Sequence, residues 1–354
     1  YTLPRPELDL AGGLGKAVAD AAVGDWLESL APNDAEYRAL SDAFVEQVER
    51  VRGDRTQPIG QGGAIHEGDS DPRVPQIAAL RRGGYLADND AGEEPGRYSA
   101  RIAAAVRQMQ EDFGIAADGV IGPDTLAILN AGAEERARTL AVNMERRRWL
   151  ARNPPRTRID VNVAAATLAY YRDGELRDSR RVVVGQPGWE TPQLGSPIYR
   201  LVANPSWTVP KSIEEEEIAG RDEAYLRRHN MVRRDGWIVQ QPGPGNALGR
   251  VKFDMQNDHA IYLHDTPAKA LFERNRRHFS HGCVRVQDAE GFAAILARDA
   301  NVQSRYRQAR ASGDETFIDI AAKIPVRLLY FTAYAGSSGV LYRADPYGWD
   351  DRVA

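Results

Sequence analysis

The segment HFSHGCVRVQD, residues 278–288, contains the only cysteine of the 354-residue chain, Cys283. A thiolate is a strong nucleophile, but a free thiol with a pKa of about 8.5 is mostly protonated at neutral pH, so it needs a nearby base or positive charge. One cysteine can form neither an intramolecular disulfide nor a thiol-rich zinc site. It is a buried structural residue, a metal ligand among histidines, or a nucleophile.

The candidate bases near this thiol in the sequence are His259, His264, His278 and His281. His264 ends the segment HAIYLHD, in which strand alternation places Tyr262 on the same face. His281 is nearer, yet neighbours along an extended chain point apart, so closeness in sequence does not establish contact. We therefore favour His264 as the base and expect His259 and His278 at the surface.

A glycine and an arginine flank the thiol. Gly282 allows close approach of the backbone to a substrate, and the N–H groups of this segment are candidate donors to an oxyanion. Arg285 shares a face with Cys283 if VRV is extended, and a guanidinium suits a carboxylate. A solvated or salt-bridged arginine is the alternative. The combination of thiol, base, oxyanion donors and cation favours a cysteine nucleophile.

Composition excludes some functions. With 46 basic and 50 acidic side chains the net charge is -4, which provides no electrostatic footprint for nucleic acid. No apolar run approaches the roughly 20 residues of a membrane-spanning helix. The length predicts two or three domains. Because the sequence begins at Tyr1, we expect a processed N-terminus and an export signal that lies outside the given chain.

Helices dominate the first part of the chain. Apolar residues at spacings of three and four predict a helix over 33–52, whereas the polar, glycine-containing stretch 52–73 is interpreted as a linker or mobile loop. From residue 74, VPQIAALRRGGYL predicts a short helix, Ser99 caps a longer one, and Pro123 opens a third. A further helix is expected over 133–150.

After residue 157 the periodicity becomes that of strands. Asp173-Gly174 between two β runs is a strong hairpin signal. Asp288 caps a helix that ends near residue 300. Further strands are expected at 198–203, 250–256, 259–264 and 326–334, with a last hairpin near 337–339. The pattern predicts an α+β, β-rich domain with short helices, not an alternating parallel α/β sheet.

An insertion at 211–249 interrupts this β pattern. KSIEEEEIAGRDEAYLRRHN is charged and reads as a helix, and QQPGPGNALG is turn-rich. QQPGPGNALG has too few apolar residues for a core, and we expect 211–249 as a whole to contribute little to the core. Since it precedes the strand that leads to the cysteine, it is interpreted as a lid; an ordinary surface excursion is the alternative.

YLHDT, followed after fifteen intervening residues from His264 to Ser280 by SHGCVRV, resembles the signature of L,D-transpeptidases with a YkuD-type catalytic domain. NPSWTVP, AYLRRHNM and PGPGNALGRVKF extend the resemblance, and the helices that end in DGVIGPDTLAIL resemble the three-helix peptidoglycan-binding module. Together these resemblances cover nearly the whole chain. They are closest to the large periplasmic murein L,D-transpeptidases of Gram-negative bacteria.

The resemblance implies a role for each site residue. Cys283 is the expected nucleophile, His264 the base, and the backbone carbonyl of Asp265 the group that orients it. His281 and Gly282, with the Cys283 amide, are expected on the oxyanion side. The expected substrate contacts are Arg285, Tyr262, Ser280, Asn246 and Trp207. Core packing is the alternative for the tryptophan.

The resemblance also implies a domain plan. It gives a helical scaffold and linker at 1–73 and 131–157, a peptidoglycan-binding module at 74–130, and a catalytic domain at 158–354 with a capping insertion at 211–249.

The implied activity is acyl transfer from a cysteine thioester, which forms 3→3 crosslinks between the diaminopimelate residues of peptidoglycan tetrapeptide stems in the periplasm. No metal and no organic cofactor is expected, and carbapenems are expected covalent inhibitors. Two alternatives remain: hydrolysis of the same bond by an L,D-carboxypeptidase or endopeptidase, and a non-catalytic cell-wall binding protein. A His/Cys zinc hydrolase is disfavoured because the chain has no HExxH-type spacing.

Overall fold

The computed structural model describes residues 3, 6–53, 57–77, 80, 84–86, 96–337 and 339–354. The chain divides into two compact units. The first is Asn153–Tyr330 together with Leu3, and the second contains the residues up to Arg152 together with Phe331–Ala354. The last residues of the chain, which the sequence placed in the catalytic domain, thus belong to the helical unit. None of the described helices is both long and apolar enough to cross a membrane.

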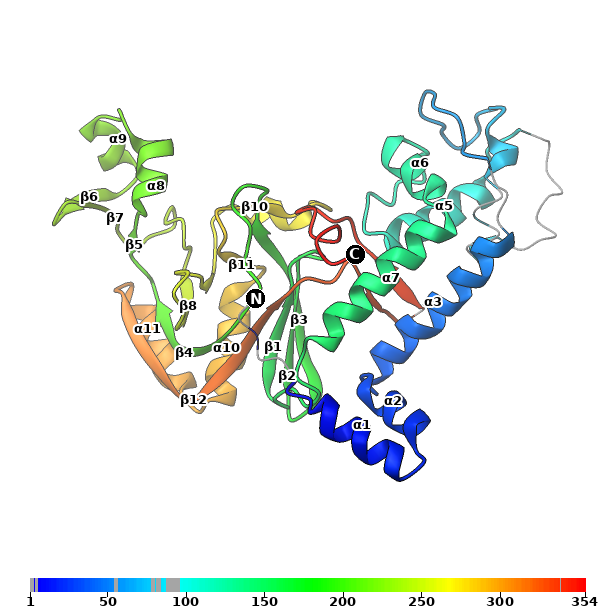
Figure 1. Cartoon of the computed structure of the whole chain (residues 1–354). Coiled ribbons are helices and arrows are strands. Elements are labelled where there is room, and N and C mark those ends of the chain that lie inside the picture. Colours follow the sequence, from blue (N-terminus) through cyan, green and yellow to red (C-terminus); the bar gives the residue numbers. More distant parts are fainter. Residues whose placement is uncertain are drawn as a thin grey trace. The chain divides into compact units, whose positions relative to one another are not determined.

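A mixed sheet forms the centre of the first unit (Figure 1). Its order is β10-β3-β11-β9-β8-β4-β12-β1-β2, and β3 also pairs with β2, so the described strands close on themselves. The pairs β1–β12, β9–β11 and β3–β10 are parallel, and the other pairs are antiparallel. The strands are β1 (Arg158–Asn162), β2 (Thr167–Arg172), β3 (Glu175–Gly185), β4 (Leu194–Ala203), β8 (Val251–Met255), β9 (Leu263–His264), β10 (His278–Ser280), β11 (Val284–Val286) and β12 (Thr316–Leu329).

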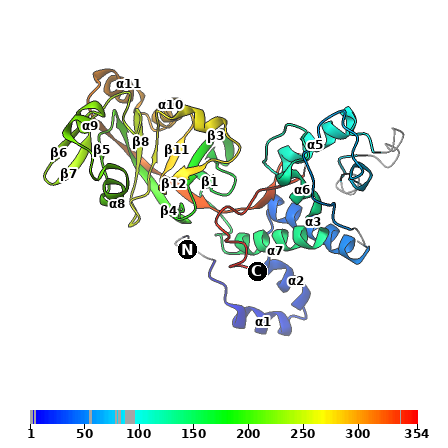
Figure 2. The ribbon, with the colours of Figure 1, turned by 90° about the horizontal axis from the view of Figure 1, so that it is seen from above.

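Helices α10 (Ala289–Asp299) and α11 (Gln303–Ser312) lie against this sheet, and η3 (Lys269–Glu273) is a short 3-10 turn (Figure 2). The Phe292 ring of α10 packs 5.5 Å from that of Phe253 on β8, measured between centroids. Asp288 caps α10 as predicted, its carboxylate accepting from a backbone N–H of the first turn. The helix therefore fixes the end of β11, the strand that follows the cysteine.

The predicted hairpin at Asp173-Gly174 is confirmed, with both residues at positive φ, 55° and 95°. Other expected strand bounds differ. The strand predicted at 326–334 begins at Thr316 and ends at Leu329, and only Leu263 and His264 of the predicted 259–264 pair as a strand.

The insertion folds as a small subdomain, seen at the upper left of Figure 1. Its predicted long helix is broken into short pieces, and Asp235-Gly236 turns a hairpin that the sequence analysis did not identify. Its elements are β5 (Trp207–Thr208), α8 (Lys211–Ile213), the π-helix η2 (Glu214–Ile218), α9 (Glu223–Arg228), β6 (Met231–Arg234) and β7 (Trp237–Gln240). The buried side chains are Val209, Ile213, Ile218, Leu226, Met231 and Ile238. The segment was expected to carry little apolar material; its apolar residues instead form a core of their own, which the sequence analysis missed because they are dispersed along the sequence and meet only after folding.

The second unit is mainly helical. Tyr37 and Leu40 of α3 pack against Leu140 and Met144 of α7, together with Ala333 of the C-terminal hairpin. The predicted helices at 33–52 and 133–150 are confirmed. The described elements are α1 (Leu10–Ala19), α2 (Val23–Leu30), α3 (Ala35–Gly53), η1 (Val74–Gln76), α5 (Ala100–Asp112), α6 (Pro123–Asn130), α7 (Ala133–Arg148), β13 (Ala333–Ala335) and β14 (Val340–Tyr342).

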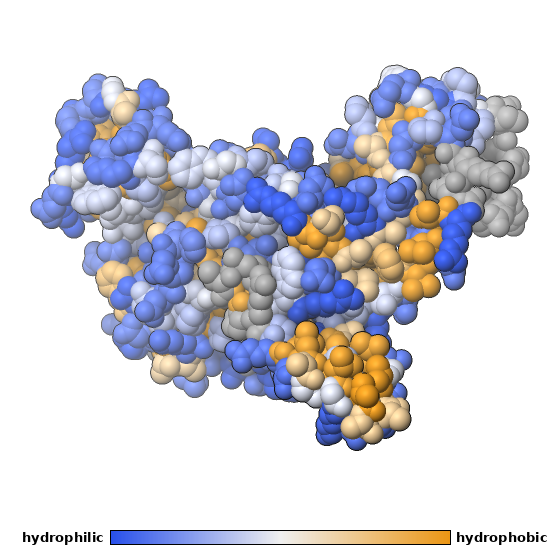
Figure 3. Space-filling view, viewed as in Figure 1, coloured by the Kyte–Doolittle hydropathy of each residue, from blue (hydrophilic) through white to orange (hydrophobic). Residues whose placement is uncertain are grey.

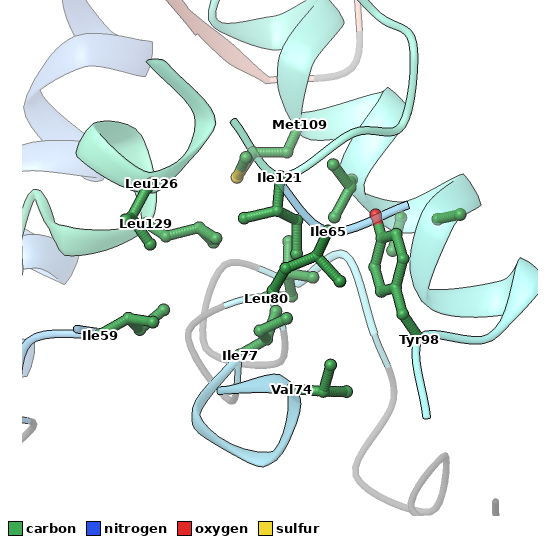
Figure 4. Packing of buried hydrophobic residues seen from close by; sticks show 13 residues of the cluster. Ile59, Ile65, Val74, Ile77, Leu80, Tyr98, Met109, Ile121, Leu126 and Leu129 are labelled. Carbon is green, nitrogen blue, oxygen red and sulfur yellow. The ribbon is translucent and has the colours of Figure 1, made fainter. Parts of the chain in front are cut away.

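A separate apolar cluster surrounds α5 and α6 (Figure 4). Ser99 and Pro123 begin these helices as predicted. The predicted short helix after residue 74 lies partly outside the described residues. Ile59 and Ile65 are buried in this cluster, and Ile65 pairs with Ile121 through backbone hydrogen bonds. The stretch interpreted as a linker is therefore, from residue 57 onward, part of this small core.

A buried polar network joins the C-terminal segment to α7. Asn143 donates to the Thr332 hydroxyl at 2.8 Å and accepts from the Thr332 N–H at 2.9 Å. The Thr332 hydroxyl in turn donates to Asp350, which is paired with Arg146 at 2.5 Å. Buried polar networks of this kind favour a single arrangement, because other arrangements would leave buried polar groups without hydrogen bonds. The hairpin β13–β14 is therefore fixed to the helices.

Helix α1 exposes Leu10, Leu14 and Val18, which are four residues apart and so lie on one face, and Leu27 of α2 is exposed as well. These side chains contribute to the orange area at the lower edge of Figure 3. Exposed apolar faces of this size occur on monomers and at interfaces alike.

Because the insertion has its own core, we predict that Leu226→Ala loosens it without disturbing the main sheet. Leu226 is 1% exposed, and truncating a buried leucine costs about 2–5 kcal/mol. Amide hydrogen exchange should accelerate across β6 and β7 and stay unchanged in β4 and β12. The control Val232→Ala, at a residue 42% exposed, should leave both unchanged. Faster exchange throughout the sheet in Leu226→Ala would show that the insertion is not an independent core.

Candidate active site

The turn that carries the cysteine connects β10 to β11. Gly282 adopts a φ of +106°. This conformation favours glycine, because the Cβ of any other residue would clash with the neighbouring backbone. The Ser280 hydroxyl accepts from the Gly282 N–H at 3.2 Å and donates to the Cys283 carbonyl at 2.6 Å. Ser280 is 2% exposed, so its hydroxyl closes the turn rather than facing a substrate.

Thr191, in the loop after β3, holds the same turn from the other side. Its buried hydroxyl donates to the Gly282 carbonyl at 2.7 Å and accepts from the Gly185 N–H at 2.8 Å. In a trans peptide the carbonyl and the next N–H point in opposite directions, so fixing Gly282 C=O fixes the Cys283 N–H. No hydrogen bond in the described part of the chain uses that N–H, which leaves it available to an oxyanion. The sequence analysis did not identify Thr191, because its hydroxyl reaches the turn only through the fold.

Cys283 is partly exposed, and its sulfur lies 3.7 Å from the Ala260 carbonyl. Burial raises the pKa of the thiol above its ordinary value. Hydrogen bonds from the backbone N–H and hydroxyl of Tyr262, and the positive charges of Lys252 and Arg285, act in the opposite direction. The resting thiol is therefore protonated at neutral pH, and the groups that would stabilise a thiolate are already in place.

His264 is buried, with 5% of its surface exposed, and its Nδ1 lies 2.5 Å from the Asp265 carbonyl oxygen. A carbonyl can only accept, so Nδ1 carries the proton and Nε2 keeps a lone pair. Burial, followed by the charge of Arg285, lowers the pKa of His264 to about 3. The imidazole is neutral at physiological pH and can accept a proton.

The strand register brings these groups together. In the parallel pair β9–β11, Arg285 lies opposite His264 and Val284 opposite Leu263. The Val284 N–H donates to the Tyr262 carbonyl, so Cys283 lies beside Tyr262. Val284 and Leu263 are fully buried on the other face, which leaves the polar groups on one face of the sheet.

Lys252 on β8 extends this row, since it lies opposite His264 in the antiparallel pair β8–β9. Its Nζ is 4.4 Å from the centroid of the Tyr262 ring and 2.8 Å from an Asp254 oxygen. The sequence analysis did not identify Lys252. Strand alternation predicts on which face of the sheet Lys252 lies, but only the pairing of β8 with β9 brings Lys252 to the site.

Arg285 is half-buried, and its Nε has no hydrogen-bond partner among the described residues. Burial lowers its pKa, while the charges of Cys283 and Glu217 raise it. It is therefore neither fully solvated nor held by an ion pair among the described residues. An available N–H at this position is suited to a carboxylate or carbonyl of a substrate.

His281 faces the insertion. Its ring lies edge-on to Trp189 at 5.1 Å between centroids, and its Nε2 is 3.4 Å from a Glu217 oxygen in η2. The Gly282 N–H is occupied by Ser280, whereas no hydrogen bond among the described residues uses the N–H of His281 or of Cys283.

Trp207 and Asn246 have structural contacts. Trp207 packs on the insertion core and hydrogen-bonds the Tyr262 side chain, which links that core to the site. Asn246 is 1% exposed, and its amide donates to the carbonyls of Pro205, Gln240 and Gln241. We therefore assign Asn246 to holding the PGPGN loop and not to direct substrate contact.

The remaining predicted residues lie around this centre. The buried Asp265 side chain accepts from the Arg250 N–H and pairs with Lys269, which fixes the carbonyl that contacts His264. His259 is exposed, as expected. The surface expectation for His278 was wrong: it is half-buried and contacts the Val163 carbonyl at 3.0 Å, because β10 packs beside β3. No group of three or more potential metal-ligating side chains gathers among the described residues.

Comparison with known proteins agrees with this arrangement. Residues 156–303 match the YkuD family, described as the L,D-transpeptidase catalytic domain, and residues 78–129 match a family described as "Putative peptidoglycan binding domain". Residues 156–303 carry a domain of the YkuD family. A "Putative L,D-transpeptidase" of Haemophilus influenzae is 33% identical over 219 aligned residues. The match covers 55% of this chain and 45% of that protein. The chain thus spans less than half the length of this relative.

Solved structures similar to this chain include an L,D-transpeptidase from Stackebrandtia nassauensis, with 16% identity and a TM-score of 0.31 over 76% of this chain and 97% of that one. Another is the catalytic domain of the Enterococcus faecium L,D-transpeptidase acylated by ertapenem, with 14% identity and a TM-score of 0.28 over 50% and 99%. Scores this low add nothing to the description of the site.

The neutral state of His264 leads to a pH prediction for acylation of Cys283 by a carbapenem. With a pKa of about 3, His264 can act as base throughout the range from about pH 5 to 8, while the thiol remains protonated. The acylation rate should therefore be nearly flat over this range. His264→Ala should be roughly 10²–10⁴-fold slower near pH 7. The acylation rate of this variant should also rise tenfold per pH unit, because without the base the reaction depends on the fraction of thiol that is ionised.

Intact-mass kinetics across the pH range measure both rates. An inflection near the ordinary histidine pKa of about 6.5 in the wild type would contradict a neutral buried base. His259→Ala, at an exposed histidine, is the matched control and should follow the wild type.

The contacts of Thr191 predict a positioning role. Thr191→Val keeps the shape but removes the hydrogen bonds of the Thr191 hydroxyl to the Gly282 carbonyl and from the Gly185 N–H, at a cost of up to about 1–3 kcal/mol each in the folded state. We expect acylation to slow about 10- to 100-fold, which is less than the roughly 10²–10³-fold loss on removing an oxyanion donor, because Thr191→Val displaces the donor without removing it. Thr191→Ser, which keeps the hydroxyl, should restore most of the rate. If Thr191→Ser is acylated as slowly as Thr191→Val, and thermal melts show that both variants are folded, the hydroxyl does not position the turn.

Proposed function

We propose that this protein is a cysteine acyltransferase that forms 3→3 crosslinks between peptidoglycan stem peptides. The observation that carries the proposal is a thiol and a neutral buried imidazole on one face of the sheet, with Tyr262 in contact with both and a folded insertion beside them. The family match to the transpeptidase domain supports the substrate class.

In the proposed first step, the Cys283 sulfur attacks the carbonyl carbon at the L-centre of diaminopimelate, and Nε2 of His264 takes the thiol proton. The carbonyl oxygen becomes an oxyanion, which the Cys283 N–H can stabilise. When the C–N bond breaks, the imidazolium returns the proton to the departing nitrogen of D-alanine. A thioester remains on Cys283.

In the second step, the side-chain amine of another stem attacks the thioester carbon, and His264 takes a proton from that amine. Collapse of the intermediate forms the new amide and releases the sulfur, which regains the proton. The reaction exchanges one amide for another, so no oxidant, reductant or net hydrolysis is involved.

The insertion supports transfer over hydrolysis. Glu217 of η2 reaches His281, and Trp207 contacts Tyr262, so a subdomain with its own core adjoins the thiol. A closed site keeps water from a thioester until the amine arrives. Arg285, whose Nε is unoccupied, is our proposed contact for a stem-peptide carboxylate.

The peptidoglycan-binding match at 78–129 supports association with the cell wall. We propose a periplasmic location for the protein, where both stem peptides are accessible. The residues assigned above to the nucleophile, base, orienting carbonyl and substrate contacts remain proposals until they are tested.

We predict that purified protein mixed with disaccharide-tetrapeptide yields a crosslinked dimer and free D-alanine. Cys283→Ala should yield neither and should not form a carbapenem adduct. Product masses provide the measurement. A trimmed tripeptide as the main product would instead indicate an L,D-carboxypeptidase. Unchanged substrate, with a folded wild-type protein, would contradict enzymatic function. The matched control is Ser206→Ala, a residue that hydrogen-bonds Glu315 away from the thiol and should leave the products unchanged.

A further inference from the structure

Lys252 has contacts beyond its place in the row of polar groups at the site. Strand pairing puts it opposite His264, on the face of the sheet that carries the thiol. Its Nζ lies 4.4 Å from the centre of the Tyr262 ring, within the range of a cation–π interaction, and 25% of its side chain is exposed. A partly desolvated ammonium binds an aromatic face more strongly than a solvated one does. Lys252 therefore fixes one face of the Tyr262 ring.

The ammonium of Lys252 is held in turn by Asp254, two residues further along β8. Lys252 contacts Oδ1 of this carboxylate at 2.8 Å, and the Arg200 guanidinium donates to Oδ2 at 2.9 and 2.7 Å. Arg200 lies opposite Asp254 in the pair β4–β8, and its guanidinium is 4.5 Å from the centre of the Phe317 ring. Because Asp254 is buried and both of its oxygens have a cationic partner, it cannot turn away without losing charge-assisted contacts.

The hydroxyl of the same tyrosine contacts the sulfur of Cys283. Tyr262 hydrogen-bonds through its side chain to both Cys283 and Trp207. An indole N–H can only donate, so the Tyr262 oxygen accepts from Trp207 and its own proton is directed toward the sulfur. This contact strengthens when the sulfur ionises, since hydrogen bonds to charged acceptors are stronger than those to neutral ones. The orientation of one aromatic ring therefore decides whether the sulfur keeps this donor.

We propose that Lys252 is a positioning residue for acyl transfer: anchored by Asp254, its ammonium holds the Tyr262 ring where the hydroxyl donates to the Cys283 sulfur. The inference rests on the proposed role of Cys283 as the nucleophile. Lys252 also favours the thiolate directly through its charge, as Arg285 does. An effect through the ring differs from this direct effect, because it requires both the Tyr262 hydroxyl and the Asp254 anchor.

The test measures how fast iodoacetamide alkylates Cys283 in the full chain, followed by intact mass. Cys283 is the only thiol, so every thiol adduct reports on it, and the thiolate is the reactive form. Lys252→Met keeps the length of the side chain but removes the charge, and it should slow alkylation roughly tenfold, the factor that corresponds to one pKa unit. Lys252→Arg keeps a cation suited to both the ring and the carboxylate, so it should restore most of the rate. Lys323→Met, at an exposed lysine on β12, is the control and should match the wild type.

A double-mutant cycle with Tyr262→Phe separates the effect through the ring from the direct effect of the charge. Phenylalanine keeps the aromatic ring and removes the hydroxyl, so Tyr262→Phe should itself slow alkylation. Side chains that act through one another give non-additive losses. In the Tyr262→Phe background, Lys252→Met should therefore cause only a small further decrease. An undiminished loss in that background would show that Lys252 acts by its charge alone and would overturn the proposal.

Asp254→Asn gives the two effects opposite signs. Loss of a nearby negative charge would by itself favour the thiolate and speed alkylation, whereas loss of the anchor should slow it. Circular dichroism melts show whether the variants remain folded, and Asp254→Asn decides the matter if Lys252→Met unfolds. A wild-type rate in Lys252→Met, no recovery in a folded Lys252→Arg, or faster alkylation of Asp254→Asn overturns the proposal. Alkylation involves no peptidoglycan, so the expected rates together with a failed crosslinking assay would count against the proposed function and not against the role of Lys252.

Discussion

The parallel pairing of β9 with β11 sets the geometry on which the site depends. Their register places Arg285 opposite His264 and the thiol beside Tyr262, while the alternate residues are buried on the other face. Lys252 joins the same row from β8. Two cations next to a buried imidazole disfavour its protonation and favour a thiolate nearby. One register therefore fixes both the position of the base and its charge state.

The second constraint is that the turn before β11 is buried and its backbone groups need partners. Ser280 and Thr191 supply these partners from two sides, and the positive φ of Gly282 allows the turn to close between them. The Cys283 N–H, where an oxyanion would form, is used by no hydrogen bond among the described residues. Hydrogen bonding that stabilises the fold thus also determines which donor is available for chemistry.

Local signals in the sequence were reliable where a few adjacent residues decide the structure. Asp173-Gly174 predicts a hairpin because both residues tolerate positive φ. Pro123 predicts a helix start because its fixed φ suits the first turn, where the N–H that proline lacks would have no helical partner. The equivalent signal at Asp235-Gly236 was present and went unused because it lies between the predicted charged helix at 211–230 and the turn-rich QQPGPGNALG, where no strand was predicted. The stretch from residue 57 looked like a linker because its two core residues, Ile59 and Ile65, stand among polar neighbours.

By itself, the sequence determined the chemical types at the site and the order of the elements that carry them. The lone thiol, the histidine that ends HAIYLHD and the alternation that aligns Tyr262 with His264 all follow from composition and local geometry. The tertiary structure alone decided that Lys252 and Thr191 reach the site, that His281 faces Glu217, and that Asn246 is occupied by backbone carbonyls. These contacts join residues from strands and loops far apart in the chain. Strand register and burial specify them, and neither can be read from neighbouring residues in the sequence.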